Sequence, residues 1–292
     1  MKNILYIANL KKDHDQKLSQ DIITYLSEAG CRVLVDTQPV LFPGKSQMVT
    51  QADLDSVDLM VVLGGDGTIL TNAQKYVQYS FPIMGINLGR VGALAVTEID
   101  NYRQNFQRYL AGDYEICNNL ALDGTILYAD GGSRSFTFFN DVFSHRGMST
   151  KLLKTGITVN NSEFSEVYAD GVIVSTPIGS SAYNLSAGGP LLATSSNCYV
   201  ITPICPQSRT VTPLVVSQYD ETALTIGENV NIGRSDNVVV VDGLEKYPVN
   251  ANDVILIKKS PRSLKLVQFS KQKFLYESVY KTIISINKKG EK

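Results

Sequence analysis

The spacing of hydrophobic residues divides the chain into two parts with different expected structures. In the first 110 residues, short apolar runs alternate with segments in which apolar residues recur every three or four positions. Strands that alternate with helices in this way are typical of an open, Rossmann-like α/β sheet, which binds ligands at the ends of its strands. The predicted strands are residues 3–8, 31–36, 58–63 and 82–87, and the predicted helices are residues 16–29, 68–79 and 98–110.

After about residue 115, the helical spacing gives way to short alternating runs. They predict strands at residues 120–128, 135–144, 152–160, 171–175, 199–202, 222–227, 238–241, 254–258 and 264–269. Asp-Gly pairs beginning at positions 123, 130, 170 and 242 are turn dipeptides that we expect between strands. We therefore predict an α/β domain over residues 1–117 and a β-sandwich-like domain over residues 118–270. A helix-like, basic segment at residues 271–292 could pack on either domain.

The composition is that of an ordinary folded protein without a strong charge. The 292 residues are 43% hydrophobic and 19% charged, and the formal net charge is -1. Such a chain has no overall positive field to collect nucleic acid or anionic lipid, so any grip on phosphate must be local. The two charge-rich stretches, residues 11–15 and 288–292, are interpreted as solvated ends.

Cysteine and histidine usage argues against a zinc site or a disulfide framework. The four cysteines form no CxxC pair, and there are only two histidines. No apolar run reaches the length that crosses a bilayer, and the first 15 residues turn polar too early for a signal peptide. We therefore expect a cytoplasmic protein that binds neither nucleic acid nor membrane.

The most informative motif is GGDGTIL at residues 64–70, between a predicted buried strand and a predicted helix. Its glycines let the backbone turn and approach a ligand closely, and the N–H groups at the start of the helix attract phosphate, so the loop can hold polyphosphate without lysines. The carboxylate of Asp66 would repel phosphate unless it binds a metal ion or accepts a proton from the attacking nucleophile. Both tasks belong to phosphoryl transfer.

Other interpretations of the glycines are weaker. A glycine-rich turn in which Asp66 caps the helix explains the glycines and the carboxylate separately, but not Thr68 together with them. A Walker A loop is excluded at residues 44–46, because Pro39 stands where its first glycine is required. The glycines between residues 85 and 92 lack the GxGxxG spacing, which disfavours hydride transfer.

Two stretches of the second half combine polar side chains with small residues. Asn140 and Asp141 interrupt an apolar run, and an amide beside a carboxylate can bind an adenine edge and two ribose hydroxyls. Taken alone, such a pair is more often a turn or a bulge. Residues 170–190 (DGVIVSTPIGSSAYNLSAGGP) predict a turn, a buried strand and a small-residue helix. The small side chains either leave room for a flat ring or merely allow close packing.

Together these motifs resemble a known family. GGDGT after a strand is similar to the superfamily that joins NAD kinases to diacylglycerol and sphingosine kinases and, more distantly, phosphofructokinases. The stretch at 170–190 resembles the long signature of NAD kinases. Three further segments match that family in order: NLGRVG at 87–92, the Asn140-Asp141 pair, and ITPICP at 201–206.

The resemblance implies an activity and a set of site residues. The activity is transfer of the γ-phosphoryl group of ATP, with Mg²⁺ or another divalent cation, to the 2′-hydroxyl of the adenosine ribose of NAD, which forms NADP. Asp66 would accept the proton of that hydroxyl, while backbone donors of Gly65, Gly67 and Thr68 would stabilise the phosphates. The residues implied to bind NAD are Asn140 and Asp141 for adenosine, Thr176, Ser181, Ala182 and Tyr183 around its pocket, and Asp170 near the nicotinamide, from the same or a neighbouring subunit.

The resemblance also bears on assembly, and the chain departs from the family in several places. It implies that residues 274–286 of the final segment return to the first domain and that the protein is a homodimer or homotetramer. Residues 92–96 (GALAV) lack an aromatic that the family often has, and Asp141 stands where the family has Glu. The other departures are Ser181 where Thr is usual, and Tyr168 and Thr212 where basic residues are common.

Two other functions fit parts of the sequence. A diacylglycerol-type lipid kinase shares GGDGT, but residues 180–187 do not suggest an apolar pocket or a membrane-facing patch. A non-catalytic NAD(P)-binding sensor would keep the pocket without the chemistry, and the presence of Asp66 argues against it. His145 is interpreted as a hydrogen-bonded residue at a strand end rather than a catalytic base.

Overall fold

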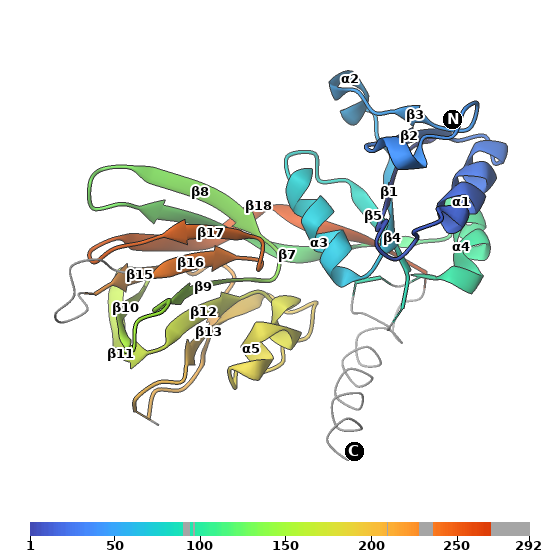
Figure 1. The fold of residues 1–292 in the computed structure, drawn as a ribbon. Helices are drawn as coiled ribbons and strands as arrows, with labels where there is room; N and C mark the ends of the chain where they lie inside the picture. The colour runs from blue at the N-terminus through green and yellow to red at the C-terminus, as the bar shows by residue number, and fades with distance from the viewer. Residues whose placement is uncertain (90–93, 96, 209, 228–235, 270–292) are drawn as a thin grey trace, which may run out of the picture. The chain divides into compact units, whose positions relative to one another are not determined.

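The computed structural model describes residues 1–89, 94–95, 97–208, 210–227 and 236–269 (Figure 1). The chain divides into two compact units. Unit 1 holds residues 1–118 and, of the described carboxy-terminal residues, 264–269, while unit 2 holds Asn119–Ser263. The predicted final segment at 271–292, with residues 274–286, lies outside the described residues.

Unit 1 is built on a parallel sheet. Its strands are β1 (Asn3–Ala8), β2 (Arg32–Val35), β3 (Gln47–Met48), β4 (Leu59–Gly64), β5 (Pro82–Asn87), β6 (Thr97–Glu98) and the last residues of β18 (Val254–Gln268). The order is β18-β5-β4-β1-β2-β3, and β6 pairs with β5. All six residues of β4 are buried, which is typical of a parallel strand in a sheet that is covered on both faces.

Helices cover both faces of this sheet. The helices are α1 (Lys17–Glu28), α2 (Gln51–Leu54), α3 (Asp66–Lys75) and α4 (Tyr102–Leu110), with 3-10 turns at Gln38–Val40 and Ile99–Asn101. Apolar residues of α1 and α4, among them Ile22 and Phe106, pack in one core with Tyr6 and Val61 of the strands. Figure 1 shows α3 on the opposite face from α1 and α4.

Unit 2 consists of two antiparallel sheets packed face to face. One has the order β14-β13-β12-β9-β16-β17, and the other contains β11-β10-β15-β18 with β7 and β8. Apolar residues from both sheets, such as Leu122, Ile157, Val174 and Tyr199, form one buried core. The bounds are β7 (Glu115–Leu127), β8 (Ser133–Phe138), β9 (Asp141–His145), β10 (Leu153–Val159), β11 (Ser162–Ala169), β12 (Gly171–Ser175), β13 (Cys198–Ile204), β14 (Leu214–Ser217), β15 (Thr222–Ile226), β16 (Val238–Val241) and β17 (Glu245–Pro248).

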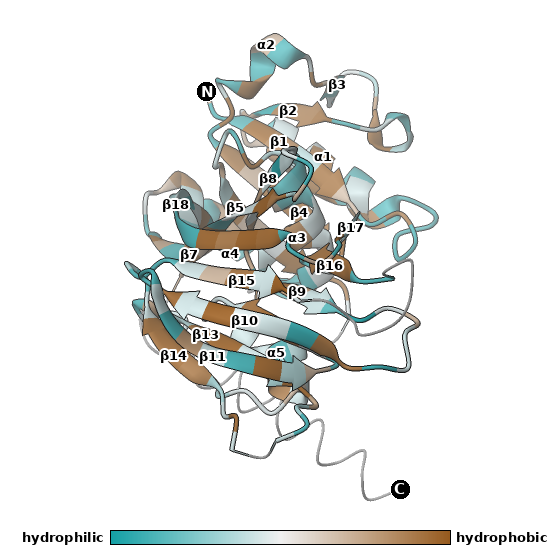
Figure 2. Cartoon of the chain, turned by 90° about the vertical axis from the view of Figure 1, so that its left-hand side faces the viewer, coloured by the Kyte–Doolittle hydropathy of each residue, from teal (hydrophilic) through white to brown (hydrophobic). Residues whose placement is uncertain are grey.

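The predicted fold class, an α/β part followed by an all-β part, is confirmed, with local differences. The run predicted at 135–144 breaks at residues 139–140 into β8 and β9, and the runs at 254–258 and 264–269 are one strand, β18. The Asp-Gly pair at 123 is not a turn, because it lies inside β7 opposite Thr137 and Phe136. β11 was not predicted, since polar residues dominate its exposed half (Figure 2).

Among the helices of the described residues, none combines the length and apolar character needed to cross a bilayer.

Candidate active site

The GGDGT motif forms the junction between β4 and α3. Gly64 ends the strand, Gly65 has an extended conformation before the helix, and Asp66 is the first helical residue. The carbonyl of Gly65 accepts from the N–H groups of Thr68 at 2.9 Å and Ile69 at 3.1 Å, which closes the first turn. A Cβ atom on Gly64 would lie 2.6 Å from the Thr68 hydroxyl oxygen, so this close approach requires glycine.

The start of α3 leaves backbone donors for an anion. Within the described residues, no protein acceptor is found for the N–H groups of Gly65 and Gly67. They lie at the positive end of the helix, where phosphate oxygens bind favourably. Thr68 differs from the expectation, because its N–H is already bound to Gly65. Thr68 therefore offers its hydroxyl, which accepts from the side-chain amide of Asn9 at 3.1 Å.

Asp66 is held by a neighbouring segment of the same unit. One oxygen of its half-buried carboxylate accepts from the N–H groups of Leu94 at 3.0 Å and Ala95 at 3.2 Å. These contacts differ from those of a carboxylate that caps its own helix. Leu94 and Ala95 belong to the segment in which the sequence departs from the family, so backbone groups of that segment orient Asp66.

A cavity of about 690 Å³ opens beside this loop within unit 1. Gly65, Gly67 and Thr68 line it together with residues that follow β1 and β2. Asp66 is not among the lining residues. The volume is within the range of small-molecule sites, and the position at the carboxyl ends of parallel strands is the usual ligand site of such sheets.

Two lysines line the same cavity. Lys11 and Lys12 follow β1, and the ammonium group of Lys12 donates to the carbonyl of Leu88 at 2.7 Å. The Lys12 nitrogen is 3.5 Å from the position that a Cβ would take on Gly89 and 3.7 Å from that on Gly65. It therefore lies near both Gly65 of the GGDGT loop and residues 88–89 after β5.

The burial of Asp13 corrects one expectation from the sequence, the interpretation of residues 11–15 as a solvated end. Buried Asp13 anchors the segment, because its carboxylate accepts from the N–H groups of Leu18 at 3.3 Å and Ser19 at 3.0 Å and from the Ser19 hydroxyl at 2.5 Å. The signal that could have revealed the lysines was their position after the first strand of an α/β sheet, at the edge where the GGDGT loop also lies.

Unit 2 carries the second group of predicted residues where the chain turns between β8 and β9. Residues 139–141 at this turn are called the corner below. The amide oxygen of Asn140 is buried and has no hydrogen-bond partner among the described residues. A buried acceptor without a partner is unusual in a folded protein, and it suits a ligand that donates a hydrogen bond. Next to it, burial and then the nearby Asp242 raise the pKa of Asp141 to about 7.

The small-residue stretch packs beside this corner. Thr176 is fully buried, and its hydroxyl donates to the carbonyl of Phe139 at 2.6 Å, so it supports the corner rather than facing solvent. The Ser181 hydroxyl donates to the Ile178 carbonyl at 3.2 Å and Ala182 follows it, at the 3-10 turn Gly179–Ser181 that precedes the short helix α5 (Tyr183–Ser186).

Tyr183 connects the corner with Asp170. Its ring is 36% exposed and meets Phe143 edge-on, with 5.0 Å between the ring centroids. Burial and then the nearby Cys205, Asp170 and Asp141 raise the pKa of the Tyr183 phenol, which shows that these groups share one neighbourhood. The structure thus brings Tyr183 near both Asp141 and Asp170.

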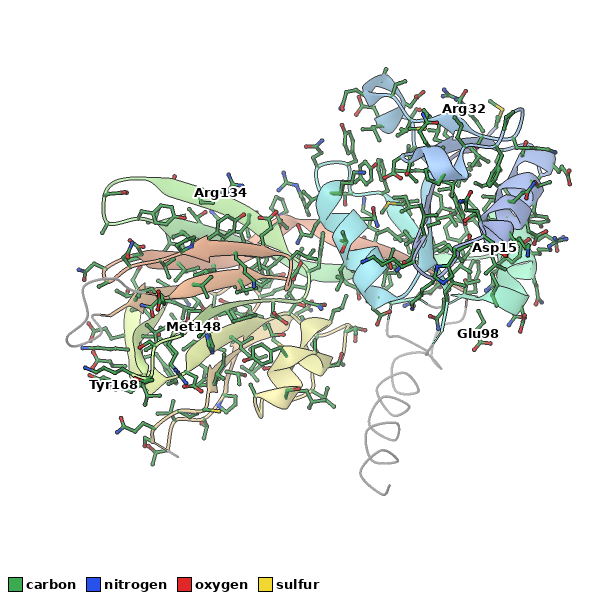
Figure 3. The ribbon with its side chains drawn as sticks, in the orientation of Figure 1. Asp15, Arg32, Glu98, Arg134, Met148 and Tyr168 are labelled. Carbon is green, nitrogen blue, oxygen red and sulfur yellow. The ribbon has the colours of Figure 1, made fainter. Side chains whose placement is uncertain are left out.

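Asp170 has a partner that the sequence did not reveal. Its carboxylate is 2.5 Å from the Arg146 guanidinium, and both side chains are about one quarter exposed. His145 accepts from the N–H of Gly147 at 3.0 Å through Nδ1, so it is a hydrogen-bonded residue at the end of β9. Tyr168 is exposed on the same unit, where its hydroxyl donates to Glu166 at 3.2 Å (Figure 3).

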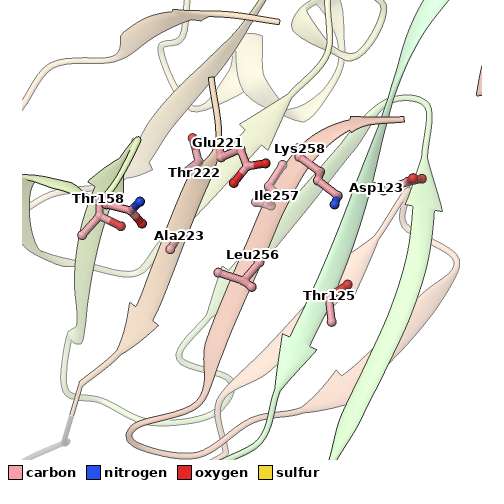
Figure 4. Close-up of a pocket in the computed structure, with 10 residues that line it drawn as sticks. Asp123, Thr125, Thr158, Glu221, Thr222, Ala223, Leu256, Ile257 and Lys258 are labelled. Atoms are coloured by element: carbon pink, nitrogen blue, oxygen red, sulfur yellow. The ribbon is translucent and has the colours of Figure 1, made fainter. Parts of the chain in front are cut away.

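A second pocket lies away from the predicted residues. It has a volume of about 190 Å³ on unit 2 and is lined by residues such as Asp123, Thr125, Leu256 and Lys258 (Figure 4). None of the predicted site residues lines it. Among the described residues, no three or more His, Cys, Asp or Glu side chains are grouped so that they could hold a metal ion.

The fold and these features define the class of protein. Backbone donors at a helix start, two lysines and an oriented carboxylate are the parts of a phosphoryl-transfer site, and an unpartnered amide beside a carboxylate suits a nucleoside. The family model for the ATP-NAD kinase N-terminal domain matches residues 4–114, and that for the ATP-NAD kinase C-terminal domain matches residues 139–269. The chain belongs to the NAD kinase family.

Known relatives match over nearly the whole chain. An NAD kinase of Lachnoclostridium phytofermentans is 35% identical over 94% of this chain and 97% of its own length, and one of Caldanaerobacter subterraneus is 30% identical over 94% and 96%. The crystal structure of yeast NADH kinase complexed with NADH has a TM-score of 0.87 at 23% identity and covers 97% of this chain and 87% of that chain. An NAD kinase from Archaeoglobus fulgidus in complex with ATP has a TM-score of 0.76 at 23% identity and covers 96% and 98%.

Proposed function

We infer that this protein is an NAD kinase that transfers the γ-phosphoryl group of ATP to the 2′-hydroxyl of the adenosine ribose of NAD, forming NADP. The observation that carries the inference is the GGDGT junction, with free backbone donors at the start of α3 beside a cavity that two lysines line. Membership in the NAD kinase family supports the same reaction and argues against the lipid kinase alternative.

We propose that the cavity of unit 1 binds the phosphates of ATP. The N–H groups of Gly65 and Gly67, the hydroxyl of Thr68 and the ammonium groups of Lys11 and Lys12 are donors and cations of the kind that bind phosphate oxygens. They neutralise charge that moves toward the leaving group during transfer, which is the main contribution of a protein to this reaction.

We propose that unit 2 binds the dinucleotide. Asn140 supplies an amide oxygen that lacks a partner, and Asp141 accepts hydrogen bonds from ribose hydroxyls when it is ionised. In this assignment Tyr183, Ser181 and Ala182 would border the adenosine, and Thr176 would support the residues that bind it through its hydrogen bond to the Phe139 carbonyl. Asp170, together with Arg146, is assigned to the nicotinamide end.

Asp66 is proposed as the group that accepts the proton of the 2′-hydroxyl. Its carboxylate is held by two backbone donors, so its orientation is fixed before substrate binds. General base catalysis of this kind typically contributes about 10²- to 10⁴-fold in rate.

A divalent cation would take most of its ligands from the nucleotide, because Mg²⁺ needs only one or two carboxylates when phosphate oxygens and water complete its shell. Asp36 lines the cavity, but its Oδ2 already accepts from Lys75 at 2.6 Å and from Tyr76 at 3.2 Å. When bound, the cation would neutralise phosphate charge.

We also propose, from the resemblance, that the protein assembles as a homodimer or homotetramer and that its location is cytoplasmic.

The reaction is tested by incubating the purified protein with ATP, MgCl₂ and NAD and measuring NADP with an NADP-specific dehydrogenase. NADP formation that depends on ATP supports the kinase. Binding of NAD without NADP formation under any divalent cation would instead identify a sensor.

A further inference from the structure

The backbone between β8 and β9 converges on a single carboxylate. The N–H groups of Phe139, Asn140 and Asp141 all donate to Asp242, at 2.9, 2.7 and 3.1 Å. Three consecutive N–H groups cannot share one acceptor group in a regular strand, where successive amides point to opposite sides. Asp242 therefore accounts for the break that separates the predicted run into β8 and β9.

Asp242 is itself fixed by the turn that carries it. It stands between β16 and β17, and both Asp242 (φ 48°) and Gly243 (φ 69°) have the left-handed conformation of a tight hairpin turn. The N–H of Asp242 donates back to the carbonyl of Asp141 at 2.8 Å. The hairpin turn and the corner are thus bonded to each other in both directions.

The carbonyl groups of the corner accept hydrogen bonds from Thr176. The N–H of Thr176 donates to the Asn140 carbonyl at 2.9 Å, and its hydroxyl donates to the Phe139 carbonyl at 2.6 Å. The backbone of the corner is therefore held by Asp242 and Thr176. The buried amide oxygen of Asn140 keeps no partner among the described residues, so it remains available to a ligand.

We propose that Asp242 is a positioning residue for NAD: by holding three backbone N–H groups it places the Asn140 and Asp141 side chains for adenosine, and it acts on NAD binding rather than on phosphoryl transfer. The proposal rests on the proposed function, which assigns the corner to the adenosine of NAD. A carboxylate is suited to this task because its two oxygens accept several hydrogen bonds at once. An amide has one acceptor oxygen, and its NH₂ group would face backbone donors.

The test compares Asp242→Asn with Asp253→Asn. Asp253 is the matched control, because it is a buried aspartate of unit 2 whose carboxylate also accepts backbone N–H groups, from Ala129 at 2.8 Å and Asn250 at 2.7 Å, away from the corner. For each variant we would measure KM for NAD, KM for ATP, kcat at saturating substrates, and the unfolding midpoint.

We expect Asp242→Asn to raise KM for NAD by about 10- to 100-fold, the effect of a small misplacement of binding groups, while KM for ATP and kcat change by less than about threefold. Asp253→Asn should lower the unfolding midpoint without changing KM for NAD. An unchanged KM for NAD in Asp242→Asn, or a loss confined to kcat, would overturn the proposal. So would a variant that fails to fold, since Asp242 would then determine the fold instead of the site.

A third variant separates this proposal from the assignment of the corner. If Asn140→Ala leaves KM for NAD unchanged, the corner does not bind adenosine and the proposed function of these residues fails. If Asn140→Ala raises KM for NAD but Asp242→Asn does not, only the positioning role of Asp242 fails.

Discussion

The GGDGT junction of unit 1 and the Asn140 corner of unit 2 use the backbone in opposite ways. At the junction, the N–H groups of Gly65 and Gly67 have no protein acceptor among the described residues. At the corner, the backbone is bound by Asp242 and Thr176. The groups proposed to contact a ligand there are the side chains of Asn140 and Asp141. A phosphate site can be made from main-chain donors, whereas a nucleoside requires side chains whose orientation other residues must fix.

The substitution with the largest expected effect on activity is Asp66→Asn. We expect kcat to fall by about 10²- to 10⁴-fold, because an amide cannot accept the hydroxyl proton. The asparagine oxygen can still accept from Leu94 and Ala95, so the loop should stay in place and NAD should still bind. Steady-state NADP formation and equilibrium NAD binding measure the two quantities. The control is Asp15→Asn, because Asp15 is an exposed aspartate of the same unit. Near-normal turnover would remove Asp66 from catalysis.

Lys12→Ala tests the unit 1 side of the comparison. We expect KM for ATP to rise by about 10- to 100-fold, the value of a charge-assisted hydrogen bond to phosphate, with KM for NAD unchanged. Lys17→Ala removes an exposed lysine that pairs with Asp15, so it should change neither KM. An equal rise of both KM values would mean that Lys12 supports the fold rather than the donor site.

Asn140→Ala gives the reverse pattern for unit 2. If this amide binds adenine as proposed, its loss should raise KM for NAD by about tenfold and leave KM for ATP unchanged. The control is Asn105→Ala, because that amide donates to the Thr97 hydroxyl in unit 1. If Lys12→Ala and Asn140→Ala both affected the same substrate, the division of labour between the two regions would be wrong.

The last prediction concerns the free energy of unfolding and not catalysis or substrate binding. Burial and Asp242 raise the pKa of Asp141 from 3.8 to about 7, so between about pH 4 and pH 7 the folded protein holds a proton that the unfolded chain has released. The free energy of unfolding therefore falls as pH rises through this range. Asp141→Asn should be more stable than the original protein at pH 8, by at most about 4 kcal/mol, with little difference near pH 4. Urea unfolding of both proteins without ligand measures this; a pH-independent difference would contradict it.

The sequence predicted the fold best where the period of apolar residues was unambiguous. The bounds of β1 and β5 agree with the predicted runs at both ends. The Asp-Gly pair at 123 misled because Gly124 serves a close approach instead of a turn: a Cβ there would collide with the ring of Phe136. A local dipeptide signal cannot distinguish these two uses of glycine.

The site was predictable in proportion to how local its interactions are. The GGDGT junction is contained in a few consecutive residues, so its glycines and Asp66 were evident. Asp242 stood in a correctly predicted turn, but its contact with Asn140 joins positions 102 residues apart. Lys12 likewise meets Leu88 across 76 residues. Neither contact leaves a trace in the spacing of neighbouring residues.

The bond between Asn9 and Thr68 connects the segment after β1 to the first turn of α3. The Asn9 side chain donates to the Thr68 hydroxyl, and its backbone N–H donates to the Leu63 carbonyl at 2.8 Å, so the lysine-bearing loop and the glycine loop are joined before any nucleotide arrives. Little conformational entropy is then lost when a triphosphate binds. None of these groups distinguishes one base from another, so a triphosphate bound here as proposed would be recognised by its length and charge, and the choice of base would depend on other residues of the cavity.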